Sequence, residues 1–142
     1  MIRIPALEEV YGQEIEELLA VAELCLKDSS VTQLSSRRRC EAAYEAAAWF
    51  AIAVLVTSDT RHRTEQTDVL LTLCREGAMV LRVDEQVRLL TRLCPREIFD
   101  GRNTARRDAD RAYQAAKRIG TVARWWLQMH KHLPSGASRL GE

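Results

Sequence analysis

The sequence predicts an all-α protein, an up-and-down bundle of about five helices with a long C-terminal helix. Turn-forming residues are scarce, with 6 Gly and 3 Pro in 142 residues, whereas an all-β chain needs a turn every ten residues or so. Apolar residues recur every three or four positions, the spacing of one helical face. We expect a single domain over residues 1–132 and a disordered tail over residues 133–142, where Pro, Gly and Ser gather.

The first helix is expected to run from Pro5 to about Asp28. Proline suits the first helical position, and the glutamates near the start favour the helix dipole. Its apolar residues recur at steps of three or four: Leu7, Tyr11, Ile15, Leu18, Ala22 and Cys25. We expect these residues to face the core.

The second helix is expected to begin among Thr32 to Ser36, which offer capping side chains, and to end at residues 57–59. Its second half, residues 46–56, is apolar on every side. A helix of this kind is surrounded by protein, so we place it at the centre of the bundle. Its eleven apolar residues are too few to span a bilayer.

Two shorter helices should follow a polar loop over residues 57–64. The first runs from about Glu65 to Glu76, and Gly77 ends or bends it. The second is capped by Asp84 and ends before Pro95, because the residue before a proline disfavours the helical conformation. Their inward residues share helical spacing: Val69, Leu70, Leu73 and Cys74 in one, and Val87, Leu90 and Leu93 in the other.

The last helix, from about Asn103 to His130, carries the clearest pattern and should be about 40 Å long. Its inward stripe has steps of four and three: Ala105, Ala109, Ala112, Ala116, Ile119, Ala123, Trp126 and His130. A second, smaller apolar stripe lies on the far side: Val122, Trp125 and Met129. This stripe is covered by the chain itself, forms a subunit interface, most simply of a two-fold homodimer, or serves as a ligand platform.

The charge is unevenly distributed along the chain. The net charge of +1 gives no reason to expect nucleic-acid or membrane binding. However, residues 1–28 carry two basic and seven acidic side chains, and residues 96–142 carry ten basic and five acidic ones. We therefore expect the first and last helices to lie near each other and attract. The alternative is a basic binding face at the C-terminal end.

The cysteines and the N-terminus indicate a cytoplasmic protein without membrane contact. No two of Cys25, Cys40, Cys74 and Cys94 form a CxxC pair, so free thiols in a helical core are expected rather than a zinc or redox motif. The first residues, Met1 to Pro5, lead directly into an acidic amphipathic segment and show no signal peptide.

Sequence motifs for common chemistry are missing, and we expect no metal and no cofactor. There is no Gly-rich phosphate loop, HExxH, EF-hand or GxSxG motif, and no ExxH pair for a di-metal bundle. His62 stands between two arginines and either binds an anion or belongs to a soluble loop. His130 and His132 form a weak metal pair or are ordinary helix-end histidines.

A basic group at the start of the last helix is the candidate anion or nucleic-acid site: Arg102, Asn103, Arg106 and Arg107. Asn103 can cap the helix, and free N–H groups at a helix N-terminus attract anions such as phosphate or the RNA backbone. The alternative is that these arginines pair with Asp100, Asp108 and Asp110, or with the acidic face of the first helix.

The chain resembles the HEPN superfamily over roughly residues 5–130. The resemblance rests on the helical bundle, the Ala- and aromatic-rich segment over residues 43–51, and Arg102-Asn103 before a long final helix. It implies a four- to five-helix domain, often dimeric. Many members are metal-independent ribonucleases of toxin–antitoxin and phage-defence systems, and others lack the catalytic residues and act as binding or partner domains.

The family's catalytic signature is Arg-x(4–6)-His, often Arg-Asn-x-x-x-His, but Arg107 stands where the histidine should be. Arginine cannot shuttle a proton. Arg124 and His130 also fit the spacing, at the wrong end of the last helix. We therefore expect a bacterial, dimeric HEPN-like binding or partner module, without catalysis, that contacts RNA or nucleotide phosphates. The alternatives are a metal-independent ribonuclease that combines Arg102 with a histidine from elsewhere in the chain, such as His62, and a helical protein–protein adaptor anchored by Trp125.

Overall fold

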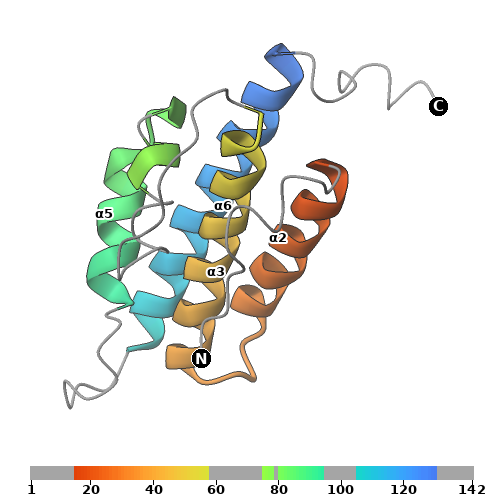
Figure 1. Cartoon of the computed structure of the whole chain (residues 1–142). Coiled ribbons are helices and arrows are strands. Elements are labelled where there is room, and N and C mark those ends of the chain that lie inside the picture. The colour runs from red at the N-terminus through yellow and green to blue at the C-terminus, as the bar shows by residue number, and fades with distance from the viewer. Residues whose placement is uncertain (1–14, 58–74, 79, 95–104, 131–142) are drawn as a thin grey trace, which may run out of the picture.

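The computed structural model describes residues 15–57, 75–78, 80–94 and 105–130. These residues form helices and no strand. The helices are α2 (Ile15–Ser30), α3 (Ser36–Leu55), α5 (Asp84–Leu93) and α6 (Arg106–Met129), and residues 75–78, 80 and 81 are helical as well. Along the chain α2, α3, α5 and α6 run alternately in opposite directions, so α3 and its neighbour α6 are parallel (Figure 1). The predicted all-α bundle with a long C-terminal helix is confirmed.

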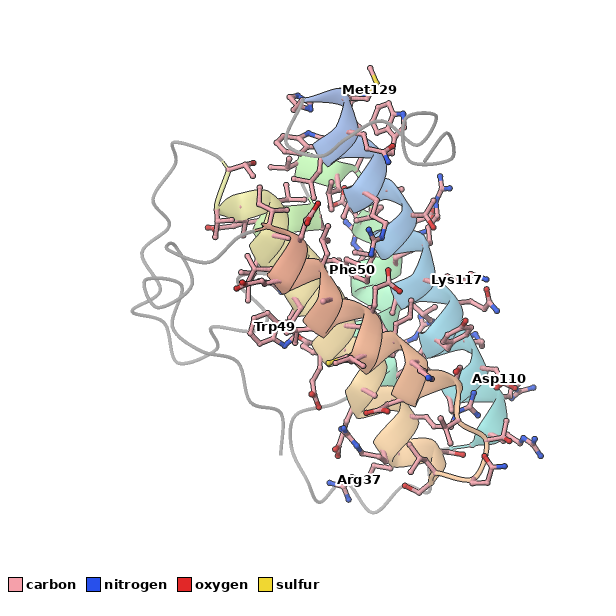
Figure 2. All side chains as sticks on the ribbon, turned by 90° about the vertical axis from the view of Figure 1, so that its right-hand side faces the viewer. Arg37, Trp49, Phe50, Asp110, Lys117 and Met129 are labelled. Carbon is pink, nitrogen blue, oxygen red and sulfur yellow. The ribbon has the colours of Figure 1, made fainter. Side chains whose placement is uncertain are left out.

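Helix α3 forms the centre of the bundle, as its sequence predicts. It packs against α2 and α6 along its length and also contacts α5. The Ser35 side chain caps its start by accepting a hydrogen bond from the Arg38 N–H at 3.1 Å. Every residue from Ala46 to Leu55 is buried except Trp49, which is partly exposed. Figure 2 shows Phe50 turned into the bundle and Trp49 at its edge.

Small residues let the helices approach α3 closely. A Cβ atom added to Gly120 of α6 would lie 2.6 Å from the Phe50 ring, and one added to Gly77 would lie 2.6 Å from the Cβ atom of Ala51. Gly77 was expected to end or bend its helix, but residues 75–78 are all helical. The role of Gly77 is therefore contact with α3, which the one-dimensional pattern does not reveal.

Two helix starts differ from the sequence prediction. Val83, not Asp84, occupies the N-cap position of α5, and Asp84 is the first helical residue, where its charge favours the helix dipole. Helix α6 begins at Arg106 with Ala105 as N-cap and no capping side chain, so the prediction that Asn103 caps this helix is wrong. Neither start uses a side-chain cap, because tertiary packing can stabilise a helix end that lacks one.

The inward stripe of α6 is confirmed in its middle and wrong at its ends. Its buried members are Ala109, Ala112, Ala116, Ile119 and Ala123. Trp126 is partly buried, while Ala105 and His130 are exposed. The two exposed residues are the N-cap and C-cap of α6, so the packed length of the helix is shorter than its apolar pattern.

The acidic first part and the basic last part of the chain meet, as expected. Helices α2 and α6 contact each other, and the Arg124 guanidinium donates two hydrogen bonds to one carboxylate oxygen of Glu23, at 2.9 and 3.0 Å. This pair joins the two helices directly. The uneven charge distribution therefore serves packing at this contact.

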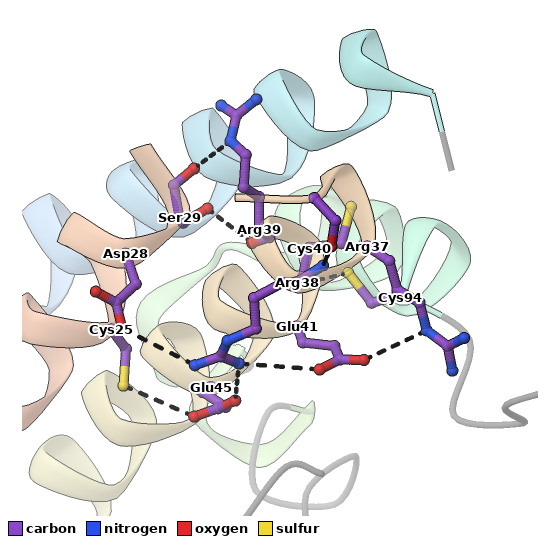
Figure 3. Close-up of polar contacts among 11 residues, drawn as sticks. Cys25, Asp28, Ser29, Arg37, Arg38, Arg39, Cys40, Glu41, Glu45 and Cys94 are labelled. Carbon is purple, nitrogen blue, oxygen red and sulfur yellow. Dashed lines mark hydrogen bonds and ion pairs between the residues drawn. The ribbon is translucent and has the colours of Figure 1, made fainter. Parts of the chain in front are cut away.

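A buried arginine joins three helices at the end of the bundle where α2 ends and α3 begins. Arg39 is 3 % exposed. Its Nε donates to the Ser29 carbonyl at 2.8 Å and its Nη2 to the Asp110 carboxylate at 2.7 Å. The Ser29 hydroxyl in turn donates to the Arg39 carbonyl at 2.9 Å (Figure 3). The end of α2, the start of α3 and the start of α6 are thereby held together.

Candidate functional site

A groove of about 600 Å³ lies between α6 and the segment that leads into α5, a volume in the range of small-ligand sites. One wall is residues 81–86. The other consists of residues from one side of α6: Arg118, Thr121, Val122 and Trp125. Three of these, Arg118, Val122 and Trp125, follow one another at steps of four and three, so they stand in line on one helical face.

The backbone at Arg82 shapes the first wall. Arg82 has a φ of 58°, a left-handed conformation that costs a residue with a Cβ atom about 1–2 kcal/mol. The residues on either side of it, Leu81 and Val83, are buried, whereas Arg82 is exposed. The turn therefore anchors the chain on both sides of Arg82 while the guanidinium reaches the groove.

Trp125 is the large aromatic surface of the groove. It is 58 % exposed, so no described element covers it. Val122 is partly buried and packs against the core, and Met129 is 62 % exposed at the far end of α6 (Figure 2). The three residues of the apolar stripe predicted on the far side of α6 therefore lie in different surroundings. Val122 and Trp125 line the groove, while Met129 stands one turn beyond it.

Both signs of charge surround this aromatic surface. Arg82 and Arg118 bring two guanidinium groups to the groove, and Asp84 and Glu85 bring two carboxylates. All four side chains are exposed. Neither arginine forms an ion pair in the part of the chain that the structure describes. The groove can therefore offer planar cationic donors and anionic acceptors beside a flat ring.

The structure describes only two of the four residues of the predicted anion site at the start of α6. Arg106 and Arg107 are exposed in its first turn, and Arg102 and Asn103 lie outside the described residues. The alternative, pairing with neighbouring aspartates, is not found between Arg106 or Arg107 and Asp108 or Asp110, and Asp100 lies outside the described residues. Asp108 lies 3.8 Å from Arg111, and Asp110 pairs with Arg39. Arg106 and Arg107 form no ion pair with any residue described.

His130, the histidine among the described residues, does not line the groove. His62 and His132 lie outside the described residues. His130 stacks on Trp126, with ring centroids 3.9 Å apart, and its Nδ1 lies 2.9 Å from the Trp126 carbonyl oxygen. Arg124 and His130, which also fit the spacing of the HEPN signature, are engaged in separate contacts, because Arg124 is hydrogen-bonded to Glu23.

A polar cluster between α2 and α3 is structural. Arg38 donates to Glu45 at 2.8 Å and lies 3.9 Å from both Asp28 and Glu41 (Figure 3). The Cys25 thiol lies 3.9 Å from Glu45. Burial, with help from the Glu45 charge, raises the pKa of Cys25 from 9.0 to about 11. A thiol held protonated is a poor nucleophile, so this cluster does not make Cys25 reactive.

The other described cysteines belong to the core. Cys40 and Cys94 are buried, and the Cys94 thiol donates to the Cys40 carbonyl at 3.1 Å. Among the residues described, no group of three or more His, Cys, Asp or Glu is placed to hold a metal ion. None of the helices described has the length and apolarity needed to cross a membrane.

No protein-family model matches the chain, and no curated protein or solved structure matches it. The resemblance to the HEPN superfamily therefore stays a prediction. The function has to be argued from the residues of this chain.

Sequence reasoning identified Val122 and Trp125 but missed the charged residues of the groove. The 4, 3 spacing of Arg118, Val122 and Trp125 would have shown that Arg118 shares the face of the tryptophan. Nothing in the sequence places Arg82, Asp84 and Glu85 opposite that face, because the left-handed turn and the packing of α5 on α6 bring them there. The groove is a product of the tertiary structure.

Proposed function

We propose that this chain is a non-catalytic, HEPN-like binding module that holds a nucleotide unit of single-stranded RNA in the groove between α6 and the start of α5. The observation that carries the proposal is Trp125, 58 % exposed, beside Arg82 and Arg118 in one groove. Stacking of a base on an aromatic side chain contributes about 1–3 kcal/mol. Arginine recognises phosphate oxygens through its planar set of donors.

The acidic residues of the groove fit the same ligand. Asp84 and Glu85 can accept hydrogen bonds from ribose hydroxyls or from amino groups of a base. They also repel phosphate, so the phosphate should lie toward Arg82 and Arg118 and the hydroxyls toward the carboxylates. The 2′-hydroxyl is the group by which proteins distinguish RNA from DNA. We therefore expect RNA to bind more tightly than DNA of the same sequence.

The absence of catalysis is proposed on the basis of Arg107, which stands in place of the histidine of the HEPN signature. Arg106 and Arg107, exposed at the start of α6, remain accessible for phosphate contacts. The free thiols of Cys25 and Cys40 suit a reducing compartment, which supports the proposed cytoplasmic location.

The test is the fluorescence anisotropy of a labelled single-stranded RNA, with the protein in EDTA, followed by a gel that shows whether the RNA is intact. Trp125→Ala should weaken binding by about 5- to 150-fold, the equivalent of one stacked base. Leu24→Ala is the matched control, because Leu24 is 65 % exposed and lies on α2. Equal affinity of the parent and Trp125→Ala would refute the proposal.

A second variant tests the cationic side of the groove. Arg82→Gly removes the guanidinium and suits the φ of 58°, since glycine adopts this conformation freely. The variant should fold as well as the parent and bind RNA more weakly. Cleavage of RNA by the parent in EDTA, and none by Arg102→Ala, would establish the ribonuclease alternative.

Self-association is a second candidate function for the same face. Met129 is 62 % exposed and lies outside the groove, next to Trp125 along the helix. A two-fold homodimer would bury this methionine against its own copy. Light scattering over a range of concentrations should then show a dimer that Met129→Glu dissociates. A monomer at all concentrations would remove this candidate and leave the RNA proposal untouched.

A further inference from the structure

A second hollow, of about 500 Å³, lies on another side of α5. It is bounded by α5 and by the helical residues that precede it: Arg75, Ala78, Asp84, Val87, Arg88, Thr91 and Arg92. Its three arginines are exposed. None of them forms an ion pair with a residue that the structure describes. With three arginines and one carboxylate, that of Asp84, the lining of the hollow has a net positive charge.

The two hollows are neighbours across α5. Asp84, the first residue of the helix, lines both of them. Arg88 and Arg92 are one turn apart on the same side of α5, and both are exposed. Arg92 lies eight residues along α5 from the shared Asp84, about 12 Å at 1.5 Å per residue. A ligand that reaches both hollows must therefore be longer than one nucleotide.

The arginines that line the hollows differ in pairing from those that join α2, α3 and α6. Arg38, Arg39 and Arg124 are paired with carboxylates of a neighbouring helix at these contacts, whereas Arg37 and Arg111 pair within their own helices. Those around the two hollows form no ion pair with the residues described: Arg75, Arg82, Arg88, Arg92 and Arg118. Only Asp84 and Glu85 oppose them among the residues that line the hollows. This distribution is suited to a polyanion that crosses α5.

We infer that the second hollow is a phosphate site for the same RNA strand. One base stacks on Trp125, the strand passes over the outer side of α5, and neighbouring phosphates are held by Arg75, Arg88 and Arg92. The inference rests on the proposed function, and it specifies the ligand further. The domain selects a strand of several nucleotides over a mononucleotide or dinucleotide, and the second hollow supplies the added affinity.

The experiment is competition of unlabelled uridine dinucleotide, tetranucleotide and octanucleotide RNA against a labelled octanucleotide. Arg88→Gln/Arg92→Gln is the test variant. Lys27→Gln/Lys117→Gln is the control, because it removes the same charge from exposed positions on α2 and α6 outside both hollows. For the parent, affinity should rise steeply from the dinucleotide to the octanucleotide.

The arginine variant should bind the octanucleotide about tenfold or more weakly than the parent and keep its dinucleotide affinity. The slope of log Kd against log salt concentration should become shallower by about 0.7 for each phosphate that the variant no longer neutralises. The inference is overturned if affinity does not grow with length, or if the lysine control is weakened as much. Dinucleotide binding that still depends on Trp125 would then leave the proposed function standing.

Discussion

Arg39 offers the sharpest test of how the bundle is held together. The guanidinium is 4 % exposed and pairs with Asp110, which is 60 % exposed. The Ser29 carbonyl that it also binds belongs to the last turn of α2, where carbonyls have no partner within the helix. Arg39→Met keeps most of the side-chain volume and removes all of these bonds. The variant therefore isolates the polar contribution from the packing.

The expected loss of stability comes mainly from the Ser29 carbonyl. A buried acceptor that loses its donor costs about 1–3 kcal/mol, and Ser29 is 0 % exposed. The ion pair adds at most about 1 kcal/mol, because solvent screens the exposed Asp110. We expect Arg39→Met to lower the free energy of unfolding by about 1–4 kcal/mol.

Urea unfolding followed by circular dichroism measures this loss, provided that the slope of free energy against urea is unchanged. Asp110→Asn is the companion variant, and it should cost less than about 1 kcal/mol because it keeps an acceptor for Arg39. The reasoning is refuted if Arg39→Met is as stable as the parent. It is also refuted if the two variants lose equal stability.

Three further predictions concern other contacts. Gly120→Ala should destabilise the protein by about 1–3 kcal/mol, since the new Cβ atom would lie 2.6 Å from the buried Phe50 ring. Thermal unfolding measures this loss of stability, and a variant more stable than the parent would contradict the prediction. Because the pKa of Cys25 is raised from 9.0 to about 11, the folded state binds this proton more tightly, so stability should fall between pH 9 and 11. The stability of Cys25→Ala should fall less over that pH range. Identical curves of stability against pH for the variant and the parent would contradict the raised pKa of Cys25. A double-mutant cycle of Glu23→Ala and Arg124→Ala should give a coupling of about 0.2–1 kcal/mol, and zero coupling would mean that the pair does not stabilise the α2–α6 contact.

Much of the fold follows from local patterns. The apolar stretch at residues 46–55 predicts a central helix, and nearly all of it is buried. Pro95 predicts the end of α5, which is at Leu93. The opposite charges of the two ends predict contact between α2 and α6, and Glu23 pairs with Arg124. Each of these predictions rests on a property of neighbouring residues that burial or charge selects directly.

Helix starts and glycine roles could not be predicted in the same way. Asn103 has the chemistry of an N-cap, yet α6 begins after Ala105, because packing decides which turn of a helix is retained. Gly77 has the chemistry of a helix end, yet it lies in a helix against Ala51. For Gly77 the local preference is small, and the contact with Ala51 outweighs it.

The sequence by itself determined the helical class, the central position of α3 and the exposed face of α6 that bears Trp125. These depend on periodicity, which requires only the regular 100° turn per residue of a helix. The tertiary structure alone decided what stands opposite that face. Arg82 and Arg118 are 36 positions apart in the chain, and they line one groove only because α5 packs on α6 and the backbone turns at Arg82. A groove is formed by residues from separate elements, and the energies that place those elements together are not encoded in the pattern of either one.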